Sequence, residues 1–391
     1  MAKGGVEEMR NEMVAAEGEI KMESFEKGAG VESHPYAFHV SGPRNVASPN
    51  WRDLISSSWK DANYKRTVMA CFVQAVYLLE IDRQENRTDE NALAPKWLIP
   101  FKYKLVETLN DDRDGSIFGA ILEWDRSAAL SDFVLIRPSG APRAVVALRG
   151  TLLKSQTMRR DIEDDLRFLT WESLKGSVRF IAALNALKSI ATKYGSNNVC
   201  TVGHSLGAGF ALQVGKALAK EGIHVEAHLF NPPSVSLAMS LRNIGEKAGF
   251  MWKRLKSMLP SNPDTQTSYE ENAPSFQIGL KQWVPHLYIN NSDYICCSYT
   301  DRENNGLQDN NEADKENAKP RNGQQVAAAA KLFLSANKGK QKFLEAHGLE
   351  QWWSDNLELQ MAISNSKLIS QQLKSLYTLP APQLTQANRG Q

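Results

Sequence analysis

The sequence has few cysteines and no long apolar run, and both absences limit what the protein can be. Its 4 cysteines have a spacing that suits neither a zinc site nor a disulfide framework. No stretch reaches about 18 consecutive apolar residues, so no membrane-spanning helix is predicted. The first residues lack the apolar core of a secretory signal, and their many glutamates are untypical of a transit peptide. We therefore expect a protein of the reducing cytoplasm, with a cytoplasmic localisation.

A strong excess of charge of either sign is also missing. Lys and Arg number 46 and Asp and Glu number 44, which leaves a net charge of +2 at pH 7. Such a balance gives no reason to expect nucleic acid or an anionic membrane as an obligate partner. With 42% hydrophobic residues, the chain can instead build a sizeable core.

Two segments are too polar to pack into that core. Residues 1–30 are charged and poor in aromatic side chains, and an insert at about 300–325 is rich in Asn, Asp and Glu. Such segments cannot bury enough apolar surface to offset their ordering entropy, so both are expected to be disordered. The sequence therefore predicts one domain over residues 31–378, interrupted by the insert and followed by a flexible tail over 379–391.

Within this domain, strand patterns alternate with helical patterns. Alternation of this kind is typical of a mostly parallel sheet flanked by helices. Helices are expected over Ser48–Leu79, over Ser177–Gly195 and from Ser205 to Gly222. Strands are expected over Ser116–Trp124, Asp132–Arg137, Pro142–Gly150, Asn198–Val202, His224–Phe230 and Trp283–Asn290.

One serine stands between two glycines, in Gly203-His204-Ser205-Leu206-Gly207. It follows a predicted strand and precedes a predicted helix, which is the context of the Gly-x-Ser-x-Gly nucleophile elbow. The backbone at such a corner is strained, and side chains two residues to either side would collide, so glycine is needed at both places. We interpret Ser205 as a nucleophile, with an ordinary tight strand-to-helix turn as the alternative.

A serine hydroxyl needs a base, and the base needs an orienting acid. In proteins whose serine lies at such an elbow, the acid precedes the base along the chain. Asp293 follows a predicted strand, where functional residues of parallel sheets gather, although it could also simply begin a turn. The histidines His224, His228 and His286 lie in or beside predicted strands. His347 follows the acid next to a glycine and aromatic residues, and is the predicted base; a histidine at the surface or at a helix end is the alternative.

Stabilisation of an oxyanion requires two hydrogen-bond donors near the serine. The backbone N–H of Leu206 is expected to be one, at the start of a helix whose dipole favours negative charge. The other is expected from Thr151, which follows the strand and the Arg149-Gly150 pair and could offer its N–H and its hydroxyl. A plain turn at the end of that strand is the alternative.

Together these residues resemble the class 3, fungal-type lipase family of α/β-hydrolases. The resemblance covers roughly Ala144–Trp353 and is sharpest at "ALRGT", "GHSLGAG", "NNSDYICC" and "AHGLEQWW". The chain looks most similar to the plant subgroup labelled GDSL esterase/lipase-like, although it has no Gly-Asp-Ser-Leu block. The resemblance implies an α/β-hydrolase fold, with Ser205, Asp293 and His347 as a catalytic triad. It also implies a lid over the site at Leu152–Leu166.

The resulting hypothesis is ester hydrolysis through an acyl-enzyme, which needs no metal and no organic cofactor. A lipid ester is the expected substrate, and Ala248–Leu259 mixes Trp, Met and Leu with Lys and Arg, as interfacial helices do. A transient contact with a membrane or lipid-droplet surface would follow. A solvated amphipathic helix that packs on the protein's own core is the alternative for this segment. Two alternatives stay open: a hydrolase of small soluble esters, and a catalytically silent lipase-like scaffold or signalling protein.

Overall fold

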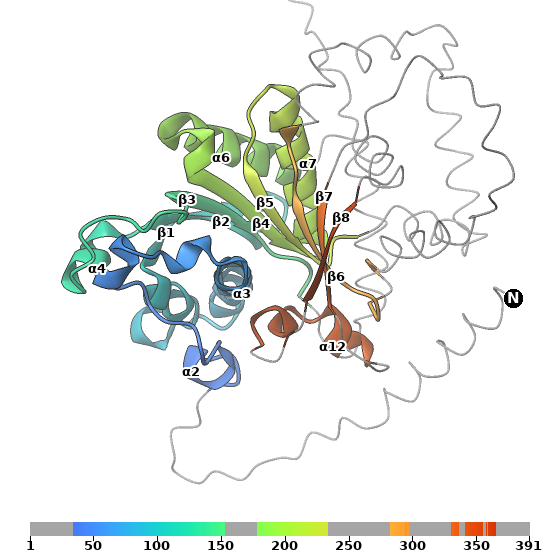
Figure 1. The fold of residues 1–391 in the computed structure, drawn as a ribbon. Helices are drawn as coiled ribbons and strands as arrows, with labels where there is room; N and C mark the ends of the chain where they lie inside the picture. The colour runs from blue at the N-terminus through green and yellow to red at the C-terminus, as the bar shows by residue number, and fades with distance from the viewer. Residues whose placement is uncertain are drawn as a thin grey trace, which may run out of the picture. The chain divides into compact units, whose positions relative to one another are not determined.

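Within the residues that the computed structural model describes, eight strands form a single sheet. These residues are 34–152, 178–233, 282–293, 295–296, 330–335, 341–354, 357 and 359–364. The order of the strands in the sheet follows the chain from β1 to β8 (Figure 1). The strands are β1 (Tyr103–Asn110), β2 (Ile117–Trp124), β3 (Ala144–Leu148), β4 (Val199–His204), β5 (Glu226–Phe230), β6 (His286–Asn290), β7 (Ala330–Ser335) and β8 (Leu359–Ser364).

The centre of this sheet is parallel. Strands β3 to β7 pair in parallel, whereas β1, β2 and β3 form an antiparallel meander and β8 runs antiparallel to β7. Leu148 at the end of β3 pairs with Gly203, and His204 at the end of β4 pairs with Phe230. The carboxyl ends of these strands therefore meet at one edge of the sheet, which is where ligand sites of open parallel sheets form.

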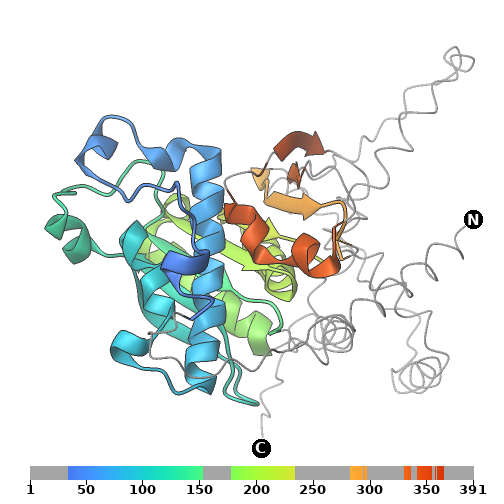
Figure 2. The same ribbon diagram turned by 90° about the horizontal axis from the view of Figure 1, so that it is seen from below.

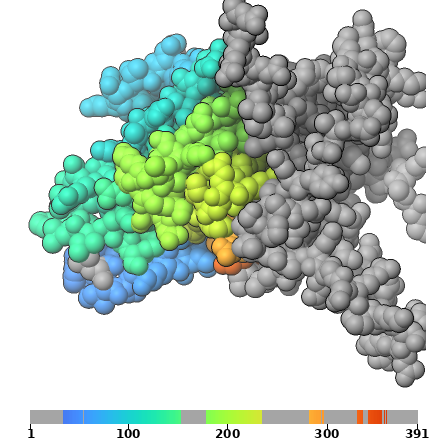
Figure 3. Space-filling view, turned by 90° about the horizontal axis from the view of Figure 1, so that it is seen from above, coloured from blue at the N-terminus to red at the C-terminus, as the bar shows by residue number. Residues whose placement is uncertain are grey.

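Helices cover both faces of the sheet. Helices α6 and α7 lie on one face, which Figure 3 shows in green and yellow, and the long helix α3 crosses the other face (Figures 1 and 2). The α-helices are α2 (Phe38–Ser41), α3 (Ala62–Gln84), α4 (Arg126–Ser131), α6 (Val178–Tyr194), α7 (Leu206–Lys220) and α12 (Phe343–His347). The 3-10 turns are η1 (Trp51–Leu54), η2 (Ser58–Lys60), η3 (Asp89–Asn91), η4 (Ala94–Trp97), η5 (Ile99–Phe101), η6 (Ser196–Asn198) and η9 (Leu349–Trp353).

Each face of the sheet packs into its own apolar cluster. On β3, Val146 and Leu148 belong to the cluster with α6 and α7, while Val145 and Ala147 belong to the cluster with α3. This division follows from the two-residue period of a strand. A strand covered on both faces needs apolar residues at every position, which explains the continuous apolar run in the sequence. The predicted mostly parallel sheet flanked by helices is confirmed.

Most predicted elements are confirmed within a few residues at their ends, but the strand predicted at Asp132–Arg137 is wrong. This segment follows α4 as a loop, and its Phe133 has a φ of 60°, in the left-handed region. A strand residue has a strongly negative φ. The side chain of Phe133 is also 78% exposed. The run is apolar without being part of the sheet.

The helix expected from Ser48 begins later, at Ala62. Asp61 caps it, because its carboxylate accepts a hydrogen bond from the backbone N–H of Tyr64 at 2.8 Å. The turns η1 and η2 occupy the preceding residues. Helical periodicity alone did not reveal this start, because the short turns also bury apolar residues such as Trp59.

The predicted disordered segments 1–30, 300–325 and 379–391 lie outside the described residues. The same holds for the expected interfacial helix at Ala248–Leu259 and for nearly all of the expected lid, of which only Leu152 is described. No helix in the described part of the chain combines the length and the apolarity that a membrane span requires.

Candidate active site

Ser205 occupies the sharp corner between β4 and α7. Its φ of 53° and ψ of −125° lie in a strained region for a residue with a side chain. A Cβ on Gly203 would lie 2.4 Å from the carbonyl oxygen of Gly207, and a Cβ on Gly207 would lie 2.4 Å from that of Leu148. Both obstacles are backbone atoms, so only glycine fits on either side of the serine, as the motif requires.

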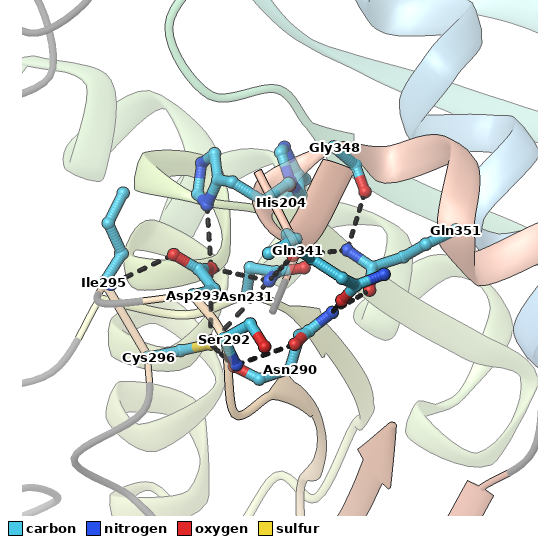
Figure 4. Close-up of polar contacts among 12 residues, drawn as sticks. His204, Asn231, Asn290, Ser292, Asp293, Ile295, Cys296, Gln341, Gly348 and Gln351 are labelled. Atoms are coloured by element: carbon cyan, nitrogen blue, oxygen red, sulfur yellow. Dashed lines mark hydrogen bonds and ion pairs between the residues drawn. The ribbon is translucent and has the colours of Figure 1, made fainter. Parts of the chain in front are cut away.

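Asp293 follows β6 and is completely buried. Its Oδ2 accepts hydrogen bonds from Nδ1 of His347 at 2.9 Å and from Nδ2 of Asn231 at 2.6 Å (Figure 4). Its Oδ1 accepts a bond from the backbone N–H of Ile295 at 3.0 Å, and the thiol of Cys296 lies 3.3 Å from Oδ2. The structure thus brings together two side chains, 54 residues apart in the sequence, that the sequence analysis predicted to act as acid and base.

These contacts keep Asp293 ionised. Burial by itself raises the pKa of the carboxyl group, but the His347 ring and the bonds from Ile295 and Asn231 outweigh burial and lower it. An ionised carboxylate beside Nδ1 holds the proton of the imidazole on that nitrogen. The other ring nitrogen, Nε2, is then the one that can take a proton from a hydroxyl group.

His347 ends the short helix α12 and is 3% exposed. Its ring stacks on that of Phe343, with ring centroids 5.2 Å apart and planes 10° apart. It lies 4.9 Å from the ring of His204, the residue that precedes the serine. Among the described residues no hydrogen bond joins the Ser205 hydroxyl to the His347 ring. Such bonds are often long in unliganded enzymes.

Two segments with potential oxyanion donors also meet at the serine. Leu206 is the first residue of α7, and the backbone N–H groups of a first helical turn have no partner within the helix. The loop after β3 passes so close that a Cβ on Gly150 would lie 2.9 Å from Cβ of Ser205. The N–H of Gly150 already donates to Oη of Tyr77 at 2.8 Å. Thr151, which the sequence predicted as the second donor, is the next residue of this loop.

A hydrogen-bond relay that the sequence did not predict connects this loop to the base. Nε2 of His204 lies 2.8 Å from the carbonyl oxygen of His347, so it carries a proton and donates it there. Nδ1 of His204 then accepts the hydroxyl of Tyr77 at 2.9 Å, and that hydroxyl accepts the N–H of Gly150 at 2.8 Å. The Arg149 side chain donates a hydrogen bond to the carbonyl oxygen of Gly150 at 2.7 Å. Both the N–H and the carbonyl group of Gly150 are therefore hydrogen-bonded.

The middle of this relay is an uncharged imidazole. Burial, followed by the nearby His347 ring, lowers the pKa of His204 to about 3. A neutral ring is what the relay needs, since one nitrogen must accept while the other donates. The only sequence signal for Tyr77 is a polar tip within the apolar stretch of α3, where a buried tyrosine hydroxyl needs a partner.

Asn231 is a second site residue that sequence analysis missed. It follows β5 directly, is fully buried and has a φ of 46°, a conformation that asparagine tolerates better than most residues. Besides Asp293, its Nδ2 reaches the carbonyl oxygen of Ala346 at 3.2 Å, and its Oδ1 accepts Nε1 of Trp352 at 2.6 Å. It therefore joins Asp293 to the segment that carries His347. Its position at the end of a strand, in "FNPP", is the signal that could have indicated it.

The sequential, mostly parallel sheet and the strained serine between β4 and α7 define the class of this protein as an α/β-hydrolase. A GDSL esterase/lipase of Arabidopsis thaliana is 30% identical over 363 residues, which cover 84% of this chain and 98% of the relative. The chain belongs to the esterase/lipase family of that protein. No family model matches the sequence.

Solved structures of lipases and esterases are similar at a more distant level. A lipase from Rhizopus microsporus var. chinensis is 13% identical, with a TM-score of 0.34, over 86% of this chain and 88% of the lipase. An esterase of Pyrobaculum calidifontis is 12% identical, with a TM-score of 0.24, over 64% of this chain and 82% of the esterase. The family assignment therefore depends on the plant relative and the fold class on the strand topology.

Proposed function

We propose that the protein is a serine carboxylester hydrolase of the class 3 lipase type that cleaves lipid esters through an acyl-enzyme. The observation that carries this proposal is the buried Asp293–His347 hydrogen bond of 2.9 Å, whose imidazole lies 4.9 Å from the ring of His204, the neighbour of a serine held at a φ of 53°. Membership of an esterase/lipase family supports the same reaction type.

In this mechanism His347 acts as the general base. Its Nε2 takes the proton of the Ser205 hydroxyl while Oγ attacks the ester carbonyl, and the N–H of Leu206 and the donors of Thr151 stabilise the resulting oxyanion. His347 then returns the proton to the departing alcohol, which leaves an acyl group on the serine. A water molecule, deprotonated by the same nitrogen, releases the acid and restores the hydroxyl. Asp293 stabilises the imidazolium in both steps.

The first test is a Ser205→Ala variant assayed with p-nitrophenyl butyrate. We expect kcat to fall by roughly 10⁴-fold or more, because removal of a triad nucleophile leaves only the oxyanion donors and binding. Ser131→Ala is the matched control, since Ser131 lies on α4 and its hydroxyl bonds only to Ser127 among the described contacts. Equal activity in the two variants would reject the assignment.

A fluorophosphonate probe and a lipid emulsion separate the alternatives. Labelling that depends on Ser205 distinguishes an enzyme from a catalytically silent scaffold, which would take up no probe. Activity that rises steeply once a triacylglycerol substrate aggregates would support a lipase that works at a lipid surface. Flat kinetics with preference for short soluble esters would instead indicate an esterase for small substrates.

A further inference from the structure

Three side chains of the types that bind transition metals gather at the other end of the sheet. Glu226 and His228 lie two residues apart on β5 and so point to the same face, and His286 is the direct partner of His228 on β6. Glu226 pairs with Cys200 near the start of β4, whereas Ser205 follows the end of that strand. The cluster is therefore separate from the candidate active site.

The three groups are close enough to share one ion. One donor atom from each of Glu226, His228 and His286 lies within 4.8 Å of the others. In a tetrahedral zinc site, bonds of about 2.1 Å place neighbouring ligand atoms about 3.4 Å apart. Nε2 of His228 and Oε1 of Glu226 are already 3.1 Å apart. The two histidine rings lie 4.7 Å apart at 88°, so a modest rotation of the His286 side chain completes the triangle.

The surroundings of His228 suit a metal ligand. The hydroxyl of Tyr288 lies 2.9 Å from Nδ1 of this buried histidine. When Nε2 binds an ion, the ring proton moves to Nδ1 and donates to that hydroxyl, which fixes the ring as outer-shell partners do in metalloproteins. His286 is half-buried and Glu226 is exposed, so an ion has an open route from solvent.

A cation already sits at this carboxylate. Nζ of Lys65, from α3, lies 3.1 Å from both oxygens of Glu226. This ammonium group would compete with a metal ion for Glu226.

We propose that Glu226, His228 and His286 form a binding site for a divalent transition-metal ion, Zn²⁺ in the first place, which replaces the Lys65 ammonium group at Glu226. Two histidines and one glutamate are a recurrent zinc ligand set that leaves a fourth position for water. The bound ion links β5 to β6, the strand that leads to Asp293. It takes no part in the serine chemistry.

The test measures metal binding directly on the full-length protein. Zn²⁺ is titrated by calorimetry, and Co²⁺ serves as a coloured probe whose visible absorption reports tetrahedral nitrogen and oxygen ligands. We expect one ion per chain. His286→Gln and Glu226→Gln, which alter side chains at the solvent edge, should each weaken Zn²⁺ binding by at least about tenfold, since even outer-shell partners contribute 10–100-fold.

Controls separate this site from surface histidines and from the hydrolase. His224→Gln changes a neighbouring histidine outside the cluster and should leave the affinity unchanged, as should Ser205→Ala. Lys65→Met should tighten binding severalfold, because it removes the competing cation. Absence of one-to-one binding, or equal loss in the His224 and His286 variants, would overturn the proposal. Unchanged affinity after Lys65→Met would refute the replacement of the ammonium group.

Discussion

Replacing Tyr77 by phenylalanine isolates the relay between the oxyanion loop and the base. The hydroxyl of Tyr77 accepts the Gly150 N–H at 2.8 Å and donates to Nδ1 of His204 at 2.9 Å. Phenylalanine keeps the ring, which packs edge-on against His204 with centroids 5.9 Å apart. The substitution therefore removes these two hydrogen bonds and keeps the aromatic ring.

The expected cost comes from the two groups that are left behind. Gly150 and His204 are both buried, and a buried polar group without a partner costs about 1–3 kcal/mol. Together they predict a loss of about 2–4 kcal/mol in the free energy of unfolding, after partial relaxation. In a domain of about 300 residues, with an unfolding entropy of about 2.1 cal/mol/K per residue, that loss lowers Tm by roughly 3–6 °C.

The substitution should also lower kcat, because it changes the position of an expected oxyanion donor. With the Gly150 peptide released on one side, Thr151 shifts relative to the serine, so we expect kcat to fall by about tenfold or more with little change in KM. Thermal unfolding and p-nitrophenyl butyrate kinetics measure the two effects. Tyr64→Phe is the matched control: it is the same substitution on α3, where the hydroxyl makes an exposed bond of 3.3 Å to Ala47. If the Tyr77 variant matched this control in both assays, the relay would have no role.

Three further substitutions or conditions test other parts of the site. Gly207→Ala would place a methyl group 2.4 Å from the Leu148 carbonyl, so we expect a loss of about 1–3 kcal/mol or more in urea unfolding; wild-type stability would contradict the tight corner. Asp293→Asn should lower kcat by about 10³–10⁴-fold at unchanged KM, because an amide favours the wrong tautomer of His347, and a drop below tenfold in steady-state kinetics would argue against the acid. Since the pKa of His204 falls from 6.5 to about 3 on folding, the unfolded chain binds this proton first as the pH drops. The contribution of His204 to stability is therefore intact above about pH 6.5 and falls by up to about 1.4 kcal/mol per pH unit towards pH 3. Urea unfolding at several pH values should show this slope in the wild type and a smaller slope in His204→Asn.

The parts of the fold that the sequence predicts are those with strong local signals. The buried strand β3 is a continuous apolar run, β4 begins with the β-branched and apolar residues Val-Cys-Thr-Val, and the serine corner has the glycine pattern of a nucleophile elbow. By contrast, β1 exposes most of its length and reads Tyr-Lys-Leu-Val-Glu-Thr-Leu-Asn. Its pairing with β2 depends on backbone hydrogen bonds, which leave no pattern in the side chains. The Asp132–Arg137 loop is the opposite case: its apolar residues predict a strand, but no neighbouring strand pairs with them.

Residues that act through distant partners were the hardest to predict. Asp293 and His347 could be chosen because chain order and chemistry restrict the candidates. Asn231 and Tyr77 carry no such restriction, since an asparagine after a strand and a tyrosine in an apolar helix are common features. Their roles depend on contacts across 62 residues to Asp293 and across 127 residues to His204. Only the assembled sheet brings those partners together.

The placement of the base follows from these distant contacts and not from its own helix. With 5 residues, α12 is far shorter than the length at which helices become stable alone. Its backbone is held instead by His204 at the carbonyl of residue 347 and by Asn231 at the carbonyl of Ala346. Gln351 also donates to Ala346 and to Gly348. Loss of these bonds would therefore displace the His347 imidazole while the apolar faces of the sheet stay packed, so we expect hydrolase activity to be lost at lower urea concentrations than the fold.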